Sequence, residues 1–141
     1  MPIRKAEAIW EGNFKKGKGR MKFGSGAFEG GYSVASRFEQ GPGTNPEELL
    51  GAAHAGCFSM ALSLFLETAG YAPESIRTVA RVHIDKVGEG FKITTIELET
   101  EGRVPGIDEK VFREKAELAK KGCPVSMALT GVEIKLQAKL L

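Results

Sequence analysis

The sequence is poor in cysteine, in net charge and in long apolar runs. It has two cysteines in 141 residues and a formal net charge of +2. So few cysteines argue against a disulfide framework, and so small a charge does not favour nucleic-acid binding. No run of 18 or more apolar residues appears, so we expect no membrane span. The N-terminal stretch lacks the apolar core of a signal peptide, which makes the cytoplasm the expected compartment.

One basic stretch, KKGKGRMK at residues 15–22, stands out from this low net charge. From Lys16 onward a basic residue occupies every second position, which places these side chains on one face of a strand. No aromatic residue is interleaved, as single-stranded nucleic-acid binding would favour. We therefore interpret the stretch as a solvated strand face and expect no nucleic-acid partner.

Length and composition predict one domain over residues 1–141, of the α+β class. The hydrophobic content of 42% and charged content of 27% are typical of globular proteins. The periodicity predicts strands and helices in alternating groups. Strands are expected at 4–11, 15–23, 31–38, 76–86, 90–100 and 131–141, and helices from Pro46 to Gly70, over 108–121 and from Pro124.

The strongest local signal is the helix that begins at TNPEELL. Asn45 suits the N-cap, Pro46 the first helical position, and Glu47 and Glu48 the positive end of the dipole. Gly70 then supplies the stop. The intervening residues leave almost no polar face, and a helix apolar on all sides is buried on all sides. One small subunit can hardly cover it, so we infer a sheet on one side and a partner subunit on the other.

The two cysteines occupy different kinds of position. Cys123 precedes Pro124 at the expected start of a short helix, where the dipole and free N–H groups favour the thiolate. A weak capping role explains Cys123 equally well. Cys57 lies about three turns inside the long helix, where burial alone raises a thiol pKa and makes the thiol inert. A reactive Cys57 therefore needs a cation brought from elsewhere.

The candidate cation is Arg37, at the end of the predicted strand 31–38. A buried guanidinium needs a carboxylate to offset its desolvation. Glu47, in the first turn of the long helix, is the plausible partner. The sequence does not itself place these groups together, and an arginine at a strand end is commonly solvated.

His54 lies one turn before Cys57 and allows three interpretations. It could act as a base for Cys57, or join Cys57 and Cys123 in a metal site. Two cysteines and one histidine fall short of a structural zinc set, so we favour a helix histidine whose hydrogen-bonding groups are satisfied. His83, within a predicted strand, is interpreted in the same way.

The two cysteines lie in two distinctive motifs, GTNPEELLGAAHAGCFSMAL and KKGCPVSMAL. Further short motifs are WEG at 10–12, RFE at 37–39, IDKVGEGF at 84–91 and VPGID at 104–108. Taken together, these segments resemble the OsmC branch of the OsmC/Ohr organic hydroperoxide reductases. The similarity extends over nearly the whole chain, and no functional position departs from the family pattern.

The resemblance implies an intertwined homodimer of α+β subunits, with antiparallel sheets, a long buried central helix and two active sites at the subunit interface. It implies that Cys57 is the peroxidatic thiol and Cys123 the resolving thiol. Arg37 and Glu47 match the arginine and glutamate that prepare the thiolate. Residues of both subunits shape each site in the family, and haem, flavin and metal are not used.

The expected function is thiol-dependent reduction of organic hydroperoxides to alcohols in stress defence, with weaker action on hydrogen peroxide. The cycle runs through a Cys57 sulfenic acid and a Cys57–Cys123 disulfide. An external dithiol, lipoyl or another, restores both thiols. A free thiol is only about 3% ionised at pH 7, so Arg37 is the group expected to stabilise the thiolate.

Three other functions remain open from the residues. A peroxide sensor would form the same disulfide without turnover. A non-catalytic dimer could hold a small apolar molecule at its interface, with both cysteines as packing residues. A metal site on His54, Cys57 and Cys123 is the third.

Overall fold

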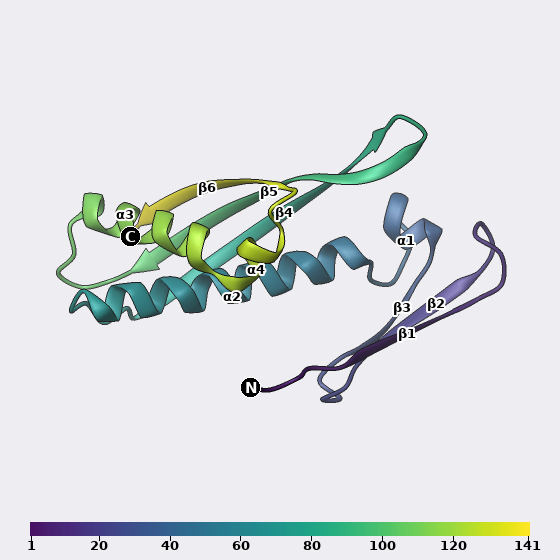
Figure 1. The fold of residues 1–141 in the computed structure, drawn as a ribbon, viewed down its shortest axis with the longest axis horizontal. Coiled ribbons are helices and arrows are strands. Elements are labelled where there is room, and N and C mark those ends of the chain that lie inside the picture. The colour runs from purple at the N-terminus through teal and green to yellow at the C-terminus, as the bar shows by residue number, and fades with distance from the viewer. The chain divides into compact units, whose positions relative to one another are not determined.

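The computed structural model describes all 141 residues, and these form two compact units, residues 1–49 and 50–141. The first unit contains an antiparallel sheet of β1 (Ala6–Glu11), β2 (Lys18–Phe23) and β3 (Glu29–Tyr32), with β2 in the centre. A short helix, α1 (Val34–Phe38), follows (Figure 1). Organisation as one domain over 1–141 stays a prediction.

The predicted strand over 31–38 is wrong beyond Tyr32, because residues 34–38 form α1 instead. Ser33 is its N-cap, and the Ser33 side chain accepts a hydrogen bond from the Ser36 backbone N–H at 3.1 Å. The Ser36 hydroxyl reciprocally accepts from the Ser33 N–H at 2.8 Å. This capping box satisfies backbone donors that a strand would have to pair elsewhere, so it outweighs the apolar alternation of the segment.

The basic stretch is placed almost as expected. Lys18, Arg20 and Lys22 share an exposed face of β2, whereas Lys16 lies in the turn before that strand. Arg20 pairs with Glu29 of the neighbouring strand at 3.2 Å. The charges thus lie on a solvated sheet face.

The second unit is built on a second three-stranded sheet, in the order β4-β5-β6. β4 (Ser75–Val87) and β5 (Gly90–Arg103) are antiparallel, and β6 (Glu133–Leu140) runs parallel to β5. Helices α3 (Glu109–Gly122) and α4 (Pro124–Ala128) connect β5 to β6. Figure 1 shows the β4–β5 hairpin extending past the end of β6. These elements confirm the predicted α+β class, but the expectation of wholly antiparallel sheets is wrong for the β5–β6 pair, which is parallel.

The long helix α2 (Pro46–Thr68) begins and ends as predicted. The Asn45 side chain accepts from the Glu48 N–H at 2.7 Å, which caps the first turn. Gly70 has a φ of +92°, and the Tyr71 N–H donates to the Leu66 carbonyl at 2.9 Å. This left-handed glycine closes the last turn.

One side of α2 forms the core of the second unit. Phe58, Leu62 and Leu66 are fully buried and pack with residues of β5 and α3. Gly51 permits a close approach to β4, because a Cβ there would lie 3.2 Å from the Val82 side chain. The alternating pattern of the sheet leaves its other face to charged pairs such as Arg81–Glu99.

The other side of α2 is not covered within the chain. Met60 is 78% exposed and Leu64 62% exposed, and a Cβ at Gly56 would meet nothing within 4 Å. Burial on all sides is therefore not achieved by a single chain.

The helix α2 is long and apolar enough to cross a membrane, since 18 of its consecutive residues have a mean hydropathy of 1.7. Counting only unbroken apolar runs in the sequence misses this property. Core helices of globular proteins have the same length and composition.

Candidate active site

The two thiols meet where α2 passes the junction of α3 and α4. Both cysteines are free, and Cys123 is fully buried. The Cys57 thiol lies close enough to the Cys123 thiol and to the backbone N–H of Val125 for both groups to shift its pKa. Two cysteines far apart in the sequence are thus brought close together.

Cys123 is held by the two helices that it separates. Its backbone N–H donates to the Ala119 carbonyl at 2.9 Å, which ends α3. Its sulfur accepts from the Ser126 backbone N–H at 3.3 Å, which caps α4, and Pro124 occupies the first position of that helix. The predicted cap role of Cys123 is therefore confirmed.

Burial raises the pKa of the Cys57 thiol above its ordinary value. The Val125 N–H acts in the opposite direction and lowers this pKa, whereas the neighbouring Cys123 raises it further. A single chain therefore holds Cys57 mainly as the thiol. This agrees with the sequence argument that a reactive Cys57 requires a cation.

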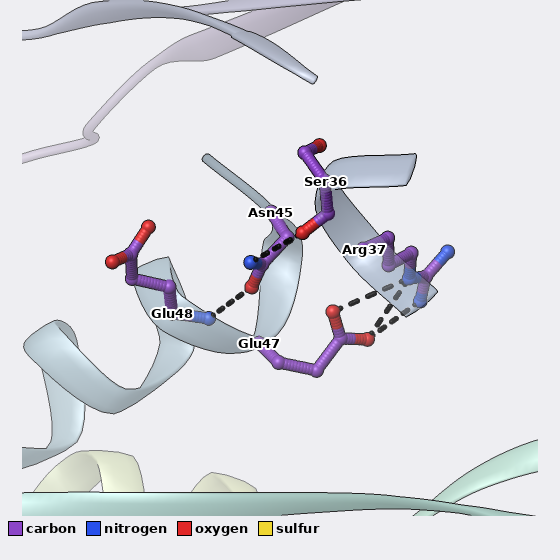
Figure 2. Close-up of polar contacts among 5 residues, drawn as sticks. All are labelled: Ser36, Arg37, Asn45, Glu47 and Glu48. Carbon is purple, nitrogen blue, oxygen red and sulfur yellow. Dashed lines mark hydrogen bonds and ion pairs between the residues drawn. The ribbon is translucent and has the colours of Figure 1, made fainter. Parts of the chain in front are cut away.

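Arg37 and Glu47 form the predicted ion pair, although Arg37 comes from α1 and not from a strand (Figure 2). The Arg37 Nη2 and Nε donate to Glu47 Oε1 at 2.8 and 3.0 Å. The Glu47 side chain is only 7% exposed, against 37% for Arg37. Such a pair fixes the direction of the guanidinium, and the second terminal nitrogen takes no part in the Glu47 contacts.

The loop before α2 fixes α1, and with it Arg37. The Asn45 side chain donates to the Ser36 carbonyl at 3.0 Å (Figure 2). The Ser36 hydroxyl donates to the Thr44 carbonyl at 2.7 Å. The same Asn45 also caps α2, so one residue ties the helix of Arg37 to the helix of Glu47.

An apolar pocket of about 240 Å³ lies beside Arg37 in the first unit. It is lined chiefly by aromatic side chains, and the Trp10 and Tyr32 rings lie 5.5 Å apart. Its lining residues are Trp10, Phe14, Tyr32, Ser33, Val34, Arg37 and Phe38. The pocket combines one cation with a wall that favours an organic group.

The predicted site residues are thus brought together as two pairs. Arg37 and Glu47 form one pair in residues 1–49, and Cys57 and Cys123 form the other in residues 50–141. Their catalytic roles, and the approach of Arg37 to a Cys57 thiol, stay predictions.

Sequence reasoning missed one polar contact at the thiols. His54 is fully buried, and its Nε2 lies 2.7 Å from the Ser126 hydroxyl, which is itself 3.3 Å from the Cys123 sulfur. The only sequence signal for this contact was the position of Ser126 in the first turn of α4. The His54 Nδ1 has no partner, so the expectation of a satisfied histidine is wrong at that nitrogen and holds only at Nε2. No three His, Cys, Asp or Glu side chains are grouped to hold a metal.

Residues 39–137 match the family model described as OsmC-like protein. The chain is also 52% identical to the Peroxiredoxin OsmC of Escherichia coli strain K12 over 138 residues, 97% of this chain and 96% of that protein. This chain belongs to the OsmC family. The resemblance inferred from the cysteine motifs is therefore confirmed.

Solved structures of OsmC-type proteins confirm the fold. The organic hydroperoxide resistance protein OhrB of Bacillus subtilis is 25% identical, with a TM-score of 0.75 over 96% of this chain and 98% of that one. An organic hydroperoxide resistance protein from Elizabethkingia anophelis is also 25% identical, with a TM-score of 0.75 over 99% of each chain.

Proposed function

We propose that this chain reduces organic hydroperoxides to alcohols, with Cys57 as the attacking thiol and Cys123 as the resolving thiol. Membership of the OsmC family, whose relatives are named peroxiredoxins and hydroperoxide resistance proteins, makes the chain a peroxide-detoxifying redox enzyme. The contact between Cys57 and Cys123 is the observation that carries the mechanism.

The proposed cycle has three steps. The Cys57 thiolate attacks the terminal oxygen of the hydroperoxide, the O–O bond breaks, and the alkoxide leaves as an alcohol after taking a proton. The resulting Cys57 sulfenic acid condenses with the Cys123 thiol, which forms the disulfide and releases water. A dithiol then reduces this disulfide by exchange and is itself oxidised to a disulfide. No prosthetic group enters the cycle.

The role proposed for Arg37 is to stabilise the Cys57 thiolate and polarise the O–O bond. Glu47 fixes the guanidinium, which limits the entropy lost when substrate binds. The resemblance to the OsmC/Ohr family implies that residues of both subunits shape each site. We therefore propose that Arg37 of one copy serves Cys57 of a second copy in a homodimer.

The uncovered side of α2 is the surface proposed for this dimer. Met60 and Leu64 are large, apolar and exposed in the single chain, and Gly56 leaves room for a close backbone approach. Covering these side chains with a second copy removes apolar surface from water. The same contact would explain why α2 has no polar face.

The aromatic pocket beside Arg37 supports a preference for organic hydroperoxides over hydrogen peroxide. An alkyl or aryl group gains free energy on leaving water for such a pocket, about 0.8 kcal/mol per buried methylene. Hydrogen peroxide has no such group. Equal catalytic efficiency with cumene hydroperoxide and with hydrogen peroxide would contradict this preference.

We also infer a reducing compartment, the cytoplasm, as the site of action. Both cysteines must return to the thiol form after each turnover, which needs a dithiol such as a lipoyl group or a thioredoxin-type protein. Reduction by dihydrolipoate and by thioredoxin can be compared directly in a coupled turnover assay.

Stopped-flow measurement of the reduced protein with cumene hydroperoxide tests the proposed function. Wild type should react far faster than free cysteine and form one disulfide per chain. Cys57→Ser should not react, and Cys123→Ser should react once and stop at a sulfenic acid. A wild-type rate equal to that of free cysteine would reject the proposal and leave both thiols as packing residues.

A further inference from the structure

A continuous polar chain runs from Cys123 into the core of the second unit. The Cys123 Sγ donates to the Ser126 Oγ at 3.3 Å, and the Ser126 Oγ lies 2.7 Å from the His54 Nε2. Cys123 and His54 are fully buried, and Ser126 is 6% exposed. Cys123 takes part in the proposed cycle, whereas His54 and Ser126 have no role in it.

We propose that His54 takes the proton of Cys123 through the Ser126 hydroxyl when the disulfide forms. The inference rests on the proposed function and assigns a proton path to its second step. His54 acts here as a positioning and proton-accepting residue, since it reaches the reacting sulfur only through Ser126. The proton donor, the relay and the proton acceptor all belong to this chain, so no added ligand is required.

Burial makes such a path necessary. Cys123 must become a thiolate to attack the sulfenic acid, yet its sulfur is fully buried and has no contact with bulk water. The Ser126 backbone N–H, at 3.3 Å, stabilises the thiolate once it has formed. It cannot remove the proton, because a backbone amide is a donor only.

The atoms balance in the proposed step. The Cys123 S–H proton moves to the Ser126 oxygen while the Ser126 O–H proton moves to His54 Nε2. The Cys123 sulfur then attacks the Cys57 sulfur, the S–S bond forms, and the S–O bond breaks. The hydroxide leaves the site, His54 releases its proton, and the two together make one water, so the overall products are one disulfide and one water. On reduction, the attacking dithiol gives up two protons, and the departing Cys123 thiolate takes one of them along the same path.

His54 has the state that the path requires. Burial lowers its pKa below the ordinary value of 6.5, so the ring is neutral at neutral pH. Acceptance at Nε2 places the ring proton on Nδ1, which is buried without a partner. An unpaired buried polar atom is costly and uncommon. An apolar side chain would fill this space without that cost, so simple packing does not account for a histidine here.

The test separates sulfenic acid formation from disulfide formation in the same protein. His54→Gln keeps a hydrogen-bonding side chain but cannot take a proton. Ser126→Ala removes the relay hydroxyl, and Ser126→Thr retains one as the matched control. Stopped-flow with cumene hydroperoxide measures the first step, and rapid alkylation with counting of free thiols by mass spectrometry measures the second.

We expect the first step of His54→Gln to stay within about twofold of wild type. Its disulfide step should slow by about 100-fold, the scale of general-base catalysis. The disulfide step of Ser126→Ala should slow by a similar factor, and combining the two substitutions should slow it no further. The disulfide step of Ser126→Thr should slow much less. The longer-lived sulfenic acid should also accumulate as sulfinic acid in excess hydroperoxide.

This inference would be overturned, and the proposed function left standing, if His54→Gln and Ser126→Ala both showed a normal first step and formed the disulfide at the wild-type rate. Absence of the first step in wild type would overturn the proposed function, and this inference with it. If His54→Gln loses both steps through misfolding, the comparison of Ser126→Ala with Ser126→Thr decides. Equal disulfide rates in those two variants would then reject the relay.

Discussion

Two inactive variants, Arg37→Ala and Cys57→Ser, should restore each other's activity when their chains form mixed dimers. In the proposed arrangement, Arg37 of one copy serves Cys57 of the other. A mixed dimer then has one complete site, built from the thiol of the Arg37→Ala chain and the guanidinium of the Cys57→Ser chain. Its second site has neither group.

The size of the effect follows from the symmetry of a dimer. Random pairing of equal amounts makes half of the dimers mixed, and each mixed dimer has one complete site out of two, so about a quarter of wild-type activity should return. Chains would be exchanged by unfolding and refolding the mixture. Peroxide consumption would then be measured with dithiol in excess.

Each variant refolded alone is the control and should stay inactive. A mixture no more active than the two variants measured separately would refute the shared site. It would mean that Arg37 and Cys57 act within one chain. Size-exclusion profiles of the refolded samples would establish that dimers had formed in every case.

Four further perturbations have defined outcomes. Met60→Asp should weaken self-association by about 100-fold or more, since about 3 kcal/mol of apolar burial is lost over two copies. The control Leu118→Asp, on the exposed side of α3, should leave self-association unchanged, and sedimentation measures the dissociation constant of both variants. Arg37→Lys should slow sulfenic acid formation about tenfold or more, because a charge-assisted hydrogen bond of ~1.5 kcal/mol is lost; stopped-flow rates equal to wild type would contradict this. Phe58→Ala should lower the free energy of unfolding by about 3–5 kcal/mol, since Phe58 is fully buried; urea titration measures it, and a loss below 1 kcal/mol would argue against the described core. Burial lowers the His54 pKa, so the contribution of neutral His54 to the free energy of unfolding is complete above pH 6.5 and falls as the pH drops toward the folded-state pKa, by at most about 1.4 kcal/mol per pH unit. His54→Gln should lack this part of the pH dependence; urea titrations from pH 7.5 to 5 that give the same pH dependence for wild type and variant would count against it.

Local signals made most of the elements predictable. Asn45, Asp108 and Cys123 each precede a helix and cap it through a side-chain atom. Gly70 ends α2 with a positive φ. The alternation in β6 matches its alternating exposure. Each of these features depends on neighbours within a few residues, so sequence alone was sufficient.

The failure at residues 33–38 has an equally local cause. Tyr32, Val34 and Phe38 suggested the period of a strand, whereas Ser33 and Ser36 form a capping box that starts α1. Two competing short-range signals were present, and backbone satisfaction outweighed periodicity. The error changed the element that carries Arg37 but not the pairing of Arg37 with Glu47.

The polar chain behind Cys123 could not be foreseen from local pattern. His54 and Ser126 are 72 positions apart and meet only because α4 packs against α2. Nothing in the residues around either one specifies the other. The unpaired His54 Nδ1 is likewise a property of the packed core. Contacts of this kind are fixed by tertiary structure, and they supply the part of the site that motifs left open.

A single turnover would show whether Cys57 and Cys123 form the proposed disulfide. Reduced protein would be treated with one equivalent of cumene hydroperoxide, and both the released alcohol and the protein would be examined by mass spectrometry. We expect one cumyl alcohol per chain, loss of two hydrogens from the protein, and a linked peptide pair containing Cys57 and Cys123. Unchanged thiols, or alcohol release without a Cys57–Cys123 link, would reject the proposed mechanism.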